Sequence, residues 1–150
     1  MKKVFIDSDI FVRDLRYPRD ARTKINQRFL QKVRSRGVAG ATSIFNLLEI
    51  CGILSFNLTG EELLGIYSGL ARLYNVQILY PALPAGELDY DLATIFCQIQ
   101  KRQSLGDAEV SFVVNRFADQ ITAFVSWNAV HFAGRLLVPS KTPGEFLKTA

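Results

Sequence analysis

The sequence predicts an α/β fold, a three-layer α/β/α sandwich around a mainly parallel sheet of four or five strands. Short β-prone apolar runs alternate along the chain with one or two longer segments of helical periodicity. Each helical segment can carry the chain back over the sheet in a right-handed crossover, so that consecutive strands run parallel. The 150 residues are 49% hydrophobic and show no repeat or linker, so we expect residues 1–150 to form a single domain.

The first half of the chain contains two short strand-like runs and four helical segments. Apolar residues recur in the helical segments at spacings of three and four, which is typical of a helix with one buried face. Pro18 ends the first segment, Asp20 can cap the second, and Ser43 can cap the third. The expected strands are residues 4–6 and 38–41, and the expected helices are residues 10–15, 21–36, 44–56 and 60–73.

The second half repeats this alternation with longer connections. Asn75 breaks the fourth helical pattern, and Pro81 and Pro84 mark a loop. Asp107 follows Gly106 and is expected to open a helix, so an N-cap role is one interpretation of this residue. The expected strands are residues 76–80, 121–126 and 136–139, and the expected helices are residues 88–101, 107–117 and a C-terminal segment from 143 or 144.

Charge is unevenly distributed along the chain. The net charge is +4, but residues 1–36 carry +7 and the remaining 114 residues carry −3. The basic part suits contact with a polyanion, and a solvated helix face explains the same pattern. Cys51 and Cys97 lie in apolar helical contexts and are expected to be buried free thiols, which fits a reducing cytoplasm. We expect neither a signal peptide nor a membrane span, because no apolar run approaches about 18 residues.

Four polar residues follow strand ends or begin helices in this layout. Asp7 ends the first strand, Glu49 lies in the helix after the second strand, Asp107 begins a later helix, and Asn128 follows the strand at 121–126. In a parallel sheet, strand ends and the first turns of the following helices meet at one edge. We therefore expect these four side chains to share one pocket.

Three carboxylates in one pocket repel one another unless a cation compensates for their charge. Mg²⁺ or Mn²⁺ is the expected ion, because carboxylate oxygens suit hard cations and the chain offers no Cys/His set for zinc. Such a site favours metal-dependent hydrolysis of phosphodiesters. Each residue also has a purely structural interpretation: Asp7 as a strand cap, Glu49 as a solvent-facing acid, Asp107 as an N-cap and Asn128 as a turn residue.

The order of these motifs resembles that of the PIN-domain ribonucleases, and in particular the VapC-like toxins of bacterial toxin–antitoxin pairs. The segments that carry the resemblance are FIDSDIF, SIFNLLEI, SLGDAEV and VSWNAVHF, which are spread over nearly the whole chain. The resemblance implies a PIN-like fold and an Mg²⁺- or Mn²⁺-dependent endoribonuclease. By position, Asp7, Glu49 and Asp107 would be the metal ligands, and Asn128 stands where many members carry a fourth acid.

Further roles follow from the same resemblance. Asp9 can restore the charge that Asn128 lacks, Ser126 can orient water, and Ser43 matches a small hydroxyl residue of the family, with N-capping as the alternative role. His131 is expected to pack or hydrogen-bond rather than act in catalysis. The candidate contacts to the RNA backbone, each of which could equally be solvated decoration, are Arg13, Arg16, Arg22 and Lys24.

The implied partners are an RNA substrate, a small antitoxin protein and a second copy of the chain. The candidate docking or dimer surface, with core burial as the alternative, consists of Phe56, Leu63, Leu64, Ile66 and Tyr67. The sequence does not separate a toxin from a housekeeping nuclease. Two other readings stay open: a degenerate PIN module that binds RNA or protein without cleavage, and a haloacid-dehalogenase-like phosphatase suggested by Asp7-Ser8-Asp9, although Ser111 stands where that class needs a second distal acid.

Overall fold

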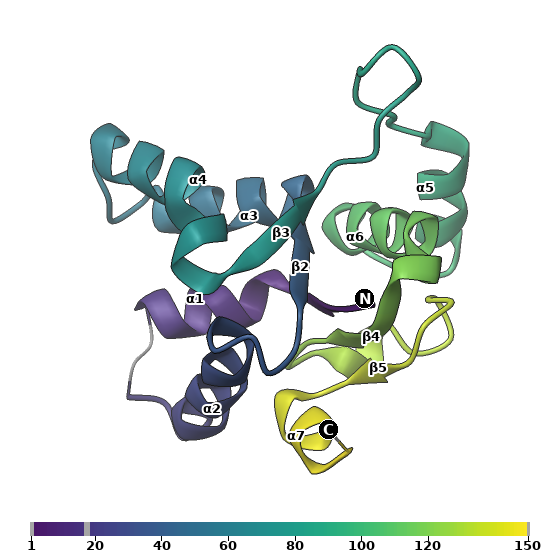
Figure 1. The fold of residues 1–150 in the computed structure, drawn as a ribbon. Coiled ribbons are helices and arrows are strands. Elements are labelled where there is room, and N and C mark those ends of the chain that lie inside the picture. The colour runs from purple at the N-terminus through teal and green to yellow at the C-terminus, as the bar shows by residue number, and fades with distance from the viewer. Residues whose placement is uncertain (1, 17–18, 150) are drawn as a thin grey trace.

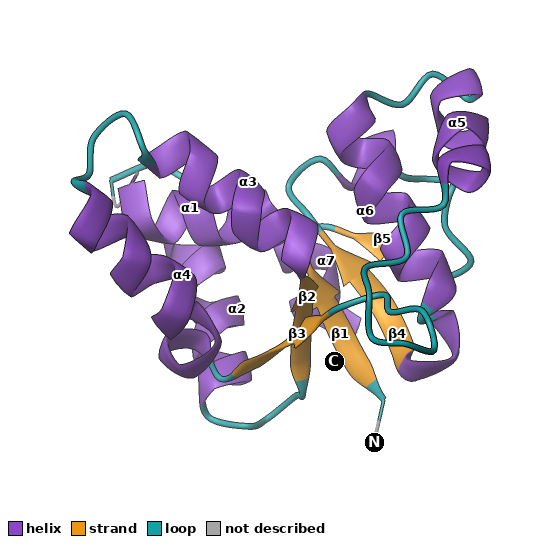
Figure 2. Ribbon diagram, turned by 90° about the horizontal axis from the view of Figure 1, so that it is seen from above, coloured by secondary structure: helices purple, strands orange, loops and turns teal. Residues whose placement is uncertain are grey.

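The computed structural model describes residues 2–16 and 19–149 and contains a five-stranded, all-parallel sheet. Figure 2 shows β1 in the middle of the sheet, between β2 and β4. The strand order β3-β2-β1-β4-β5 means that the chain builds outward from β1 on one side and then continues with β4 on the other. The strands are β1 (Lys3–Ile6), β2 (Gly40–Ser43), β3 (Val76–Leu79), β4 (Ile121–Val125) and β5 (Ser140–Lys141).

Helices cover both faces of the sheet, as the predicted sandwich requires. Val4 and Ile6 of β1 face a core formed with α1–α4 and α7, whereas Phe5 faces a second core formed with α5 and α6. Figure 2 shows α5 and α6 on one side of the sheet and α1, α2 and α4 on the other. The helices are α1 (Ser8–Arg16), α2 (Thr23–Arg34), α3 (Ile44–Leu54), α4 (Gly60–Tyr74), α5 (Leu92–Gln100), α6 (Leu105–Arg116) and α7 (Pro143–Thr149), with 3-10 turns η1 (Ala118–Gln120) and η2 (Ala129–His131).

The C-terminal helix α7 packs beside α2 at the lower edge of the molecule (Figure 1). The rings of Phe29 and Phe146 meet edge to face with their centroids 5.5 Å apart. This contact closes the first core, and the packing of an aromatic pair adds to the hydrophobic gain from burial.

Several element boundaries differ from those predicted. The second strand is Gly40–Ser43 rather than 38–41, and the last strand is Ser140–Lys141 rather than 136–139. Helix α1 begins directly at Ser8, and α2 begins at Thr23 without a side-chain cap. Asp20 instead accepts a hydrogen bond from the backbone of Arg22 one turn earlier. The break predicted at Pro18 lies outside the described residues.

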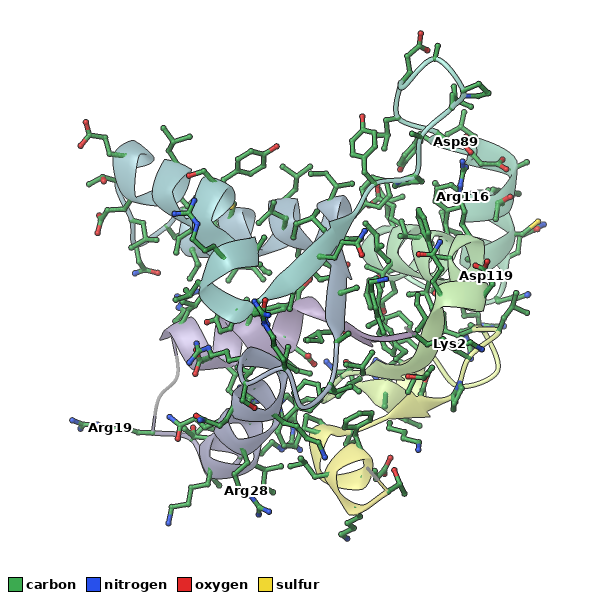
Figure 3. All side chains as sticks on the ribbon, in the orientation of Figure 1. Lys2, Arg19, Arg28, Asp89, Arg116 and Asp119 are labelled. Carbon is green, nitrogen blue, oxygen red and sulfur yellow. The ribbon has the colours of Figure 1, made fainter. Side chains whose placement is uncertain are left out.

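Helix α5 begins at Leu92 rather than Leu88, because Leu88 is held in an antiparallel bridge with Ala82. Arg116 of α6 forms an ion pair with Asp89 and donates to the carbonyl of Ala82 at 2.7 Å. Figure 3 shows the side chains of Arg116 and Asp89 pointing toward one another. These contacts hold the loop of residues 81–91 against α6, so residues 88–91 are not part of helix α5.

Surface exposure corrects two further expectations. Cys51 is half-buried but Cys97 is exposed, so the prediction of two buried thiols was wrong for Cys97. In the candidate docking surface, Leu63 and Ile66 pack against the core, whereas Phe56 is 87% exposed and Leu64 is 64% exposed. Tyr67 is also exposed, so core burial does not account for the whole surface. No helix in the described part of the chain is long and apolar enough to span a membrane.

Gly40 is required by close packing in the centre of the sheet. A Cβ atom at this position would lie 2.7 Å from Cγ1 of Val33 and 3.0 Å from Cγ1 of Val76, and both valines are buried. We expect Gly40→Ala to lower the free energy of unfolding by about 1–3 kcal/mol, a typical cost of overpacking. Thermal unfolding followed by circular dichroism should show a melting temperature lower by roughly 3–10 °C.

Gly52→Ala is the matched control for this experiment. A Cβ atom at Gly52 in α3 meets nothing within 4 Å, and alanine is the better helix former there. We expect Gly52→Ala to keep or raise the melting temperature. Equal losses in the two variants would contradict a specific packing requirement at Gly40.

Candidate active site

The strand order reverses direction between β1 and β4, and in open parallel sheets the carboxyl ends of the strands at such a point are the usual place for a ligand. Asp7 lies at this point, directly after β1, and is 8% exposed. Its Oδ1 accepts hydrogen bonds from the Ser8 amide at 2.9 Å and from Asn46 Nδ2 at 3.1 Å. Its Oδ2 accepts from the Ser126 hydroxyl at 2.8 Å. The strand therefore delivers a carboxylate whose orientation is fixed on both oxygens.

Asp9 lies beside Asp7 and shares its hydroxyl partner. Ser126 Oγ is 3.1 Å from Asp9 Oδ2, which also accepts from the Trp127 amide at 3.0 Å. The other oxygen, Oδ1, is buried and has no hydrogen-bond partner among the described residues. Asp9 thus places a second carboxylate at the same edge, with one buried acceptor left free.

Asn128 contributes a donor rather than a ligand. Its Nδ2 lies 3.4 Å from Asp9 Oδ2, and its backbone amide donates to Ser126 Oγ at 3.0 Å. The side chain is exposed. Asn128 is therefore at the predicted edge, where it supports Asp9 and Ser126 instead of adding charge.

Asn46 organises the network from α3, a role that the sequence analysis missed. Its Nδ2 donates to Asp7 and, at 2.8 Å, to Ser8 Oγ. Its Oδ1 accepts from the Ser43 hydroxyl, and that hydroxyl accepts in turn from the Asn46 amide as the helix cap. The available signal was an amide side chain one turn before Glu49 in an otherwise apolar helix. The N-cap role predicted for Ser43 is confirmed, and its hydroxyl also holds the Asn46 side chain in place.

Glu49 and Asp107 approach the site from α3 and α6. A Cβ atom added to Gly106 would lie 3.3 Å from Glu49 Oε2, so this glycine leaves room for the glutamate. Burial raises the pKa of Glu49, the Ser8 hydroxyl lowers it by hydrogen bonding, and the charge of Asp107 raises it again. Asp107 is the third residue of α6. The N-cap of this helix is Ser104, whose hydroxyl oxygen accepts a hydrogen bond from the backbone amide of Asp107. The N-cap interpretation of Asp107 was therefore wrong, and its carboxylate instead interacts with the Ser104 side chain and with His131.

The acids of this edge interact pairwise: the charges of Asp9 and Glu49 act on Asp7, and those of Asp107 and Glu109 act on Glu49. Burial followed by the charge of Asp9 raises the pKa of Asp7 well above its ordinary value, and the charge of Glu49 adds to the effect. Burial raises the pKa of Asp9 to about 6, against the hydrogen bonds from Ser126 and Trp127. Burial also raises the pKa of Asp107, and His131 opposes this shift. Residues distant in the sequence are thus close enough to disfavour one another's ionisation.

The donor set of this cluster suits a hard divalent cation. Carboxylate oxygens are the ligands that Mg²⁺ and Mn²⁺ prefer, and the free Oδ1 of Asp9 is an unsatisfied acceptor that a cation would satisfy. As the side chains lie, no three Asp, Glu, His or Cys residues within 2–16 and 19–149 are arranged around a common metal position. Metal ligation by Asp7, Glu49 and Asp107 therefore stays a prediction.

The candidate RNA contacts divide into two groups. Arg13 and Arg22 lie over the ring of Trp127, with guanidinium carbons 5.4 and 5.0 Å from its centroid. Arg13 also pairs with Asp20 at 2.7 Å, and its charge lowers the pKa of Asp9. Arg16 is exposed at the end of α1.

Lys24 lies apart from this group, in a surface cavity of about 660 Å³ that it lines with Gln27, Arg28, Gln31, Lys32 and Leu147. Figure 3 shows Arg28 extending from α2 into solvent. The acidic cluster and Trp127 are thus bordered by Arg13 and Arg22, whereas Lys24 belongs to a separate basic surface.

Ser111, the position at which a phosphatase of the haloacid-dehalogenase class would need an acid, is fully buried in α6. Its hydroxyl has no hydrogen-bond partner among the described residues, and the position carries no acid. Nothing in this arrangement supports the phosphatase reading.

No protein-family model matches the chain, and no curated protein matches its sequence. Solved structures do match. The Mycobacterium tuberculosis toxin VapC20, described as cleaving the sarcin-ricin loop, aligns with a TM-score of 0.62 at 17% identity, covering 93% of this chain and 100% of that one. A chain of FitAB bound to an IR36 DNA fragment aligns with a TM-score of 0.62 at 12% identity, covering 93% and 94%. Likenesses at such low identity concern the fold alone, and the fold of this chain is PIN-like, as in VapC20.

Proposed function

We propose that the protein is a divalent-metal-dependent endoribonuclease and the toxin of a VapBC-type toxin–antitoxin pair. The observation that carries the proposal is the position of Asp7 and Asp9 at the carboxyl end of β1, where the charge of Glu49 acts on Asp7 and that of Asp107 acts on Glu49. The likeness to VapC20, which cleaves an RNA loop, supports RNA as the substrate. The motif resemblance supports the same class.

In this proposal Asp7, Glu49 and Asp107 hold Mg²⁺ or Mn²⁺, and the ion supplies water activation and charge neutralisation at the phosphate. Ser126 fixes the carboxylates of Asp7 and Asp9 relative to each other. Asn46 fixes Asp7 and Ser8, and Ser8 in turn supports Glu49. The protein's part in the reaction is to hold these groups in place and to bring a phosphate to them.

The test is cleavage of single-stranded RNA by the purified protein with Mg²⁺, with Mn²⁺ and with EDTA. Cleavage that requires either metal and stops with EDTA supports the proposal. Binding of RNA without cleavage under all three conditions would favour a non-catalytic PIN module. Hydrolysis of a phosphomonoester without cleavage of RNA would favour the phosphatase reading.

Asp9 is proposed to supply the charge that Asn128 does not. We expect Asp9→Asn to lower kcat about 10–100-fold, the usual range for a group that supports a metal site. Adding Asn128→Asp to that variant should recover most of the loss, because Asn128 Nδ2 lies 3.4 Å from Asp9 Oδ2 and a carboxylate there restores the charge nearby. Single-turnover cleavage rates of the two variants measure this. Equal rates in Asp9→Asn and the double variant would contradict this role. They would mean that catalysis needs a carboxylate at the position of Asp9 itself, and not only a negative charge nearby.

The proposal includes a small antitoxin protein, a homodimer and a cytoplasmic location. The exposed residues Phe56, Leu64 and Tyr67 offer an apolar surface for a protein partner. Co-purification with the products of adjacent genes, followed by the cleavage assay with and without the co-purified protein, tests this part.

A further inference from the structure

A cavity of about 350 Å³ has Asp107 in its wall. It is formed where the α5–α6 connection meets η2 and the loop after it, and it is lined by Arg102, Gln103, Asp107, Val130, His131 and Arg135. This volume lies at the lower end of the range of about 300–1,000 Å³ that small-molecule sites occupy. Because Asp107 belongs both to this wall and to the acidic cluster, a ligand in the cavity lies next to the proposed reaction centre.

Gln103 is an unsatisfied amide in the cavity wall. The residue is 6% exposed, and neither its Oε1 nor its Nε2 has a hydrogen-bond partner among the described residues. Buried polar groups without partners cost free energy and are uncommon in folded proteins. A donor and an acceptor side by side match the edge of a nucleobase, as in the pairing of glutamine with adenine.

Two arginines add positive charge to the same wall. Arg135 Nε and Nη2 donate to the carbonyl of Lys101 at 3.3 and 2.8 Å, and Nη1 donates to Ala133 at 3.0 Å. Three of its five N–H groups are thus used to hold the guanidinium in place, and two remain. Arg102 is exposed, has a positive φ of 68°, and makes no side-chain hydrogen bond or ion pair with the described residues. These cations stand in the part of the sequence, residues 37–150, whose net charge is −3.

We propose that this cavity is a nucleotide subsite for the RNA strand, a conclusion that rests on the proposed ribonuclease function. Arg102 and Arg135 contact a backbone phosphate next to the one that is cleaved, and Gln103 hydrogen-bonds to the base of that nucleotide. The subsite gives the enzyme a base preference at one position beside the cleavage point, because an amide contacts only a base with a complementary edge.

The proposal is tested by sequencing the products that the wild-type protein and two variants release from a pool of randomised single-stranded RNA. Gln103→Met keeps the volume of the side chain and removes the amide, and we expect it to reduce the base preference at one position by about tenfold. Arg102→Gln should raise KM about tenfold, leave kcat within about twofold, and weaken the salt dependence of KM. Arg72→Ala, which removes an exposed arginine in the last turn of α4, is the charge-matched control and should change neither quantity.

An unchanged base profile in Gln103→Met together with an unchanged KM in Arg102→Gln would overturn the subsite while leaving the ribonuclease proposal intact. If the wild-type protein cleaves no RNA, the ribonuclease proposal fails. The subsite is then tested by measuring the affinity of the variants for RNA. Fluorescence anisotropy with a labelled single-stranded RNA should then show weaker binding by Arg102→Gln than by Arg72→Ala. Equal affinities of those two variants would refute the subsite on its own.

Discussion

Replacing Asp7 by asparagine should abolish RNA cleavage, lowering kcat by about 10³-fold or more. The physical reason is the loss of the buried carboxylate at the centre of the acidic cluster, which in our proposal holds the metal ion. A loss of about 4 kcal/mol of transition-state stabilisation, within the several kcal/mol that a catalytic metal supplies, corresponds to that factor. Rates measured under single-turnover conditions with saturating Mn²⁺ test this expectation.

The same variant should fold normally, so that lost activity cannot be attributed to unfolding. Asparagine can keep its carbonyl oxygen toward Ser8 and Asn46 and place its amide toward Ser126, whose hydroxyl can then donate to Asp9. Because burial raises the pKa of Asp7 well above its ordinary value, its ionised form destabilises the metal-free fold. We therefore expect Asp7→Asn to melt at the same temperature as the wild type, or higher, in EDTA at neutral pH. A variant that melts well below the wild type would make its inactivity uninformative about the site.

The second large effect is stabilisation by metal, with a definite pH dependence. Asp9 has a pKa of about 6 in the folded protein, above the ordinary 3.8, so folding favours its protonated form. The contribution of Asp9 to the stability of the metal-free protein should therefore be greatest below about pH 4. This contribution should be lost as the pH rises to about 6 and above. Asp7, Glu49 and Asp107 shift in the same direction.

Saturating Mn²⁺ should reverse this loss, because an ion that binds only the folded state stabilises it by about 2.7 kcal/mol at 100 times its Kd. We expect the melting temperature to rise by roughly 5–10 °C at about pH 7.5 and by much less at about pH 4.5, where protons compete for the carboxylates. Differential scanning calorimetry at the two pH values measures both shifts. Equal shifts at the two pH values would indicate that the ion binds elsewhere.

The sequence predicted the sheet, and the place of Asp7 directly after its first strand, because these depend on local chemistry. A short apolar strand that ends in Asp7, and Ser43 capping the helix that carries Glu49, are signals contained in a few adjacent residues. Parallel connections then bring such ends together. The four- or five-stranded parallel sandwich was confirmed as a five-stranded, all-parallel sheet.

What the sequence did not predict depends on tertiary contacts. The role of Asn46 exists only because α3 lies against the end of β1, and its amide there meets Asp7 and Ser8. The late start of α5 follows from the ion pair of Arg116 with Asp89, which fixes the preceding loop. Arg13 and Arg22 lie together because both pack over the ring of Trp127, whereas Lys24 lines a separate cavity. The position of Trp127 is fixed in turn by its indole N–H, which donates to Asn26 at 2.8 Å. None of these partners lies within one helical turn of its counterpart in the chain.

Asp9 has a buried oxygen, Oδ1, without a hydrogen-bond partner among the described residues, and this oxygen is an acceptor for the predicted metal ion. Asp9 was expected to compensate for Asn128 by charge, and the two side chains do lie together, with Ser126 between Asp9 and Asp7. Metal binding by the cluster remains the prediction on which catalysis depends.

Isothermal titration of Mn²⁺ into the wild-type protein and into Asp7→Asn tests that prediction most directly, because it needs neither RNA nor an antitoxin. We expect the wild type to bind the ion at neutral pH with an affinity at least tenfold higher than that of the variant. The same affinity in both proteins, or no binding by the wild type, would contradict a metal site at the carboxyl end of β1.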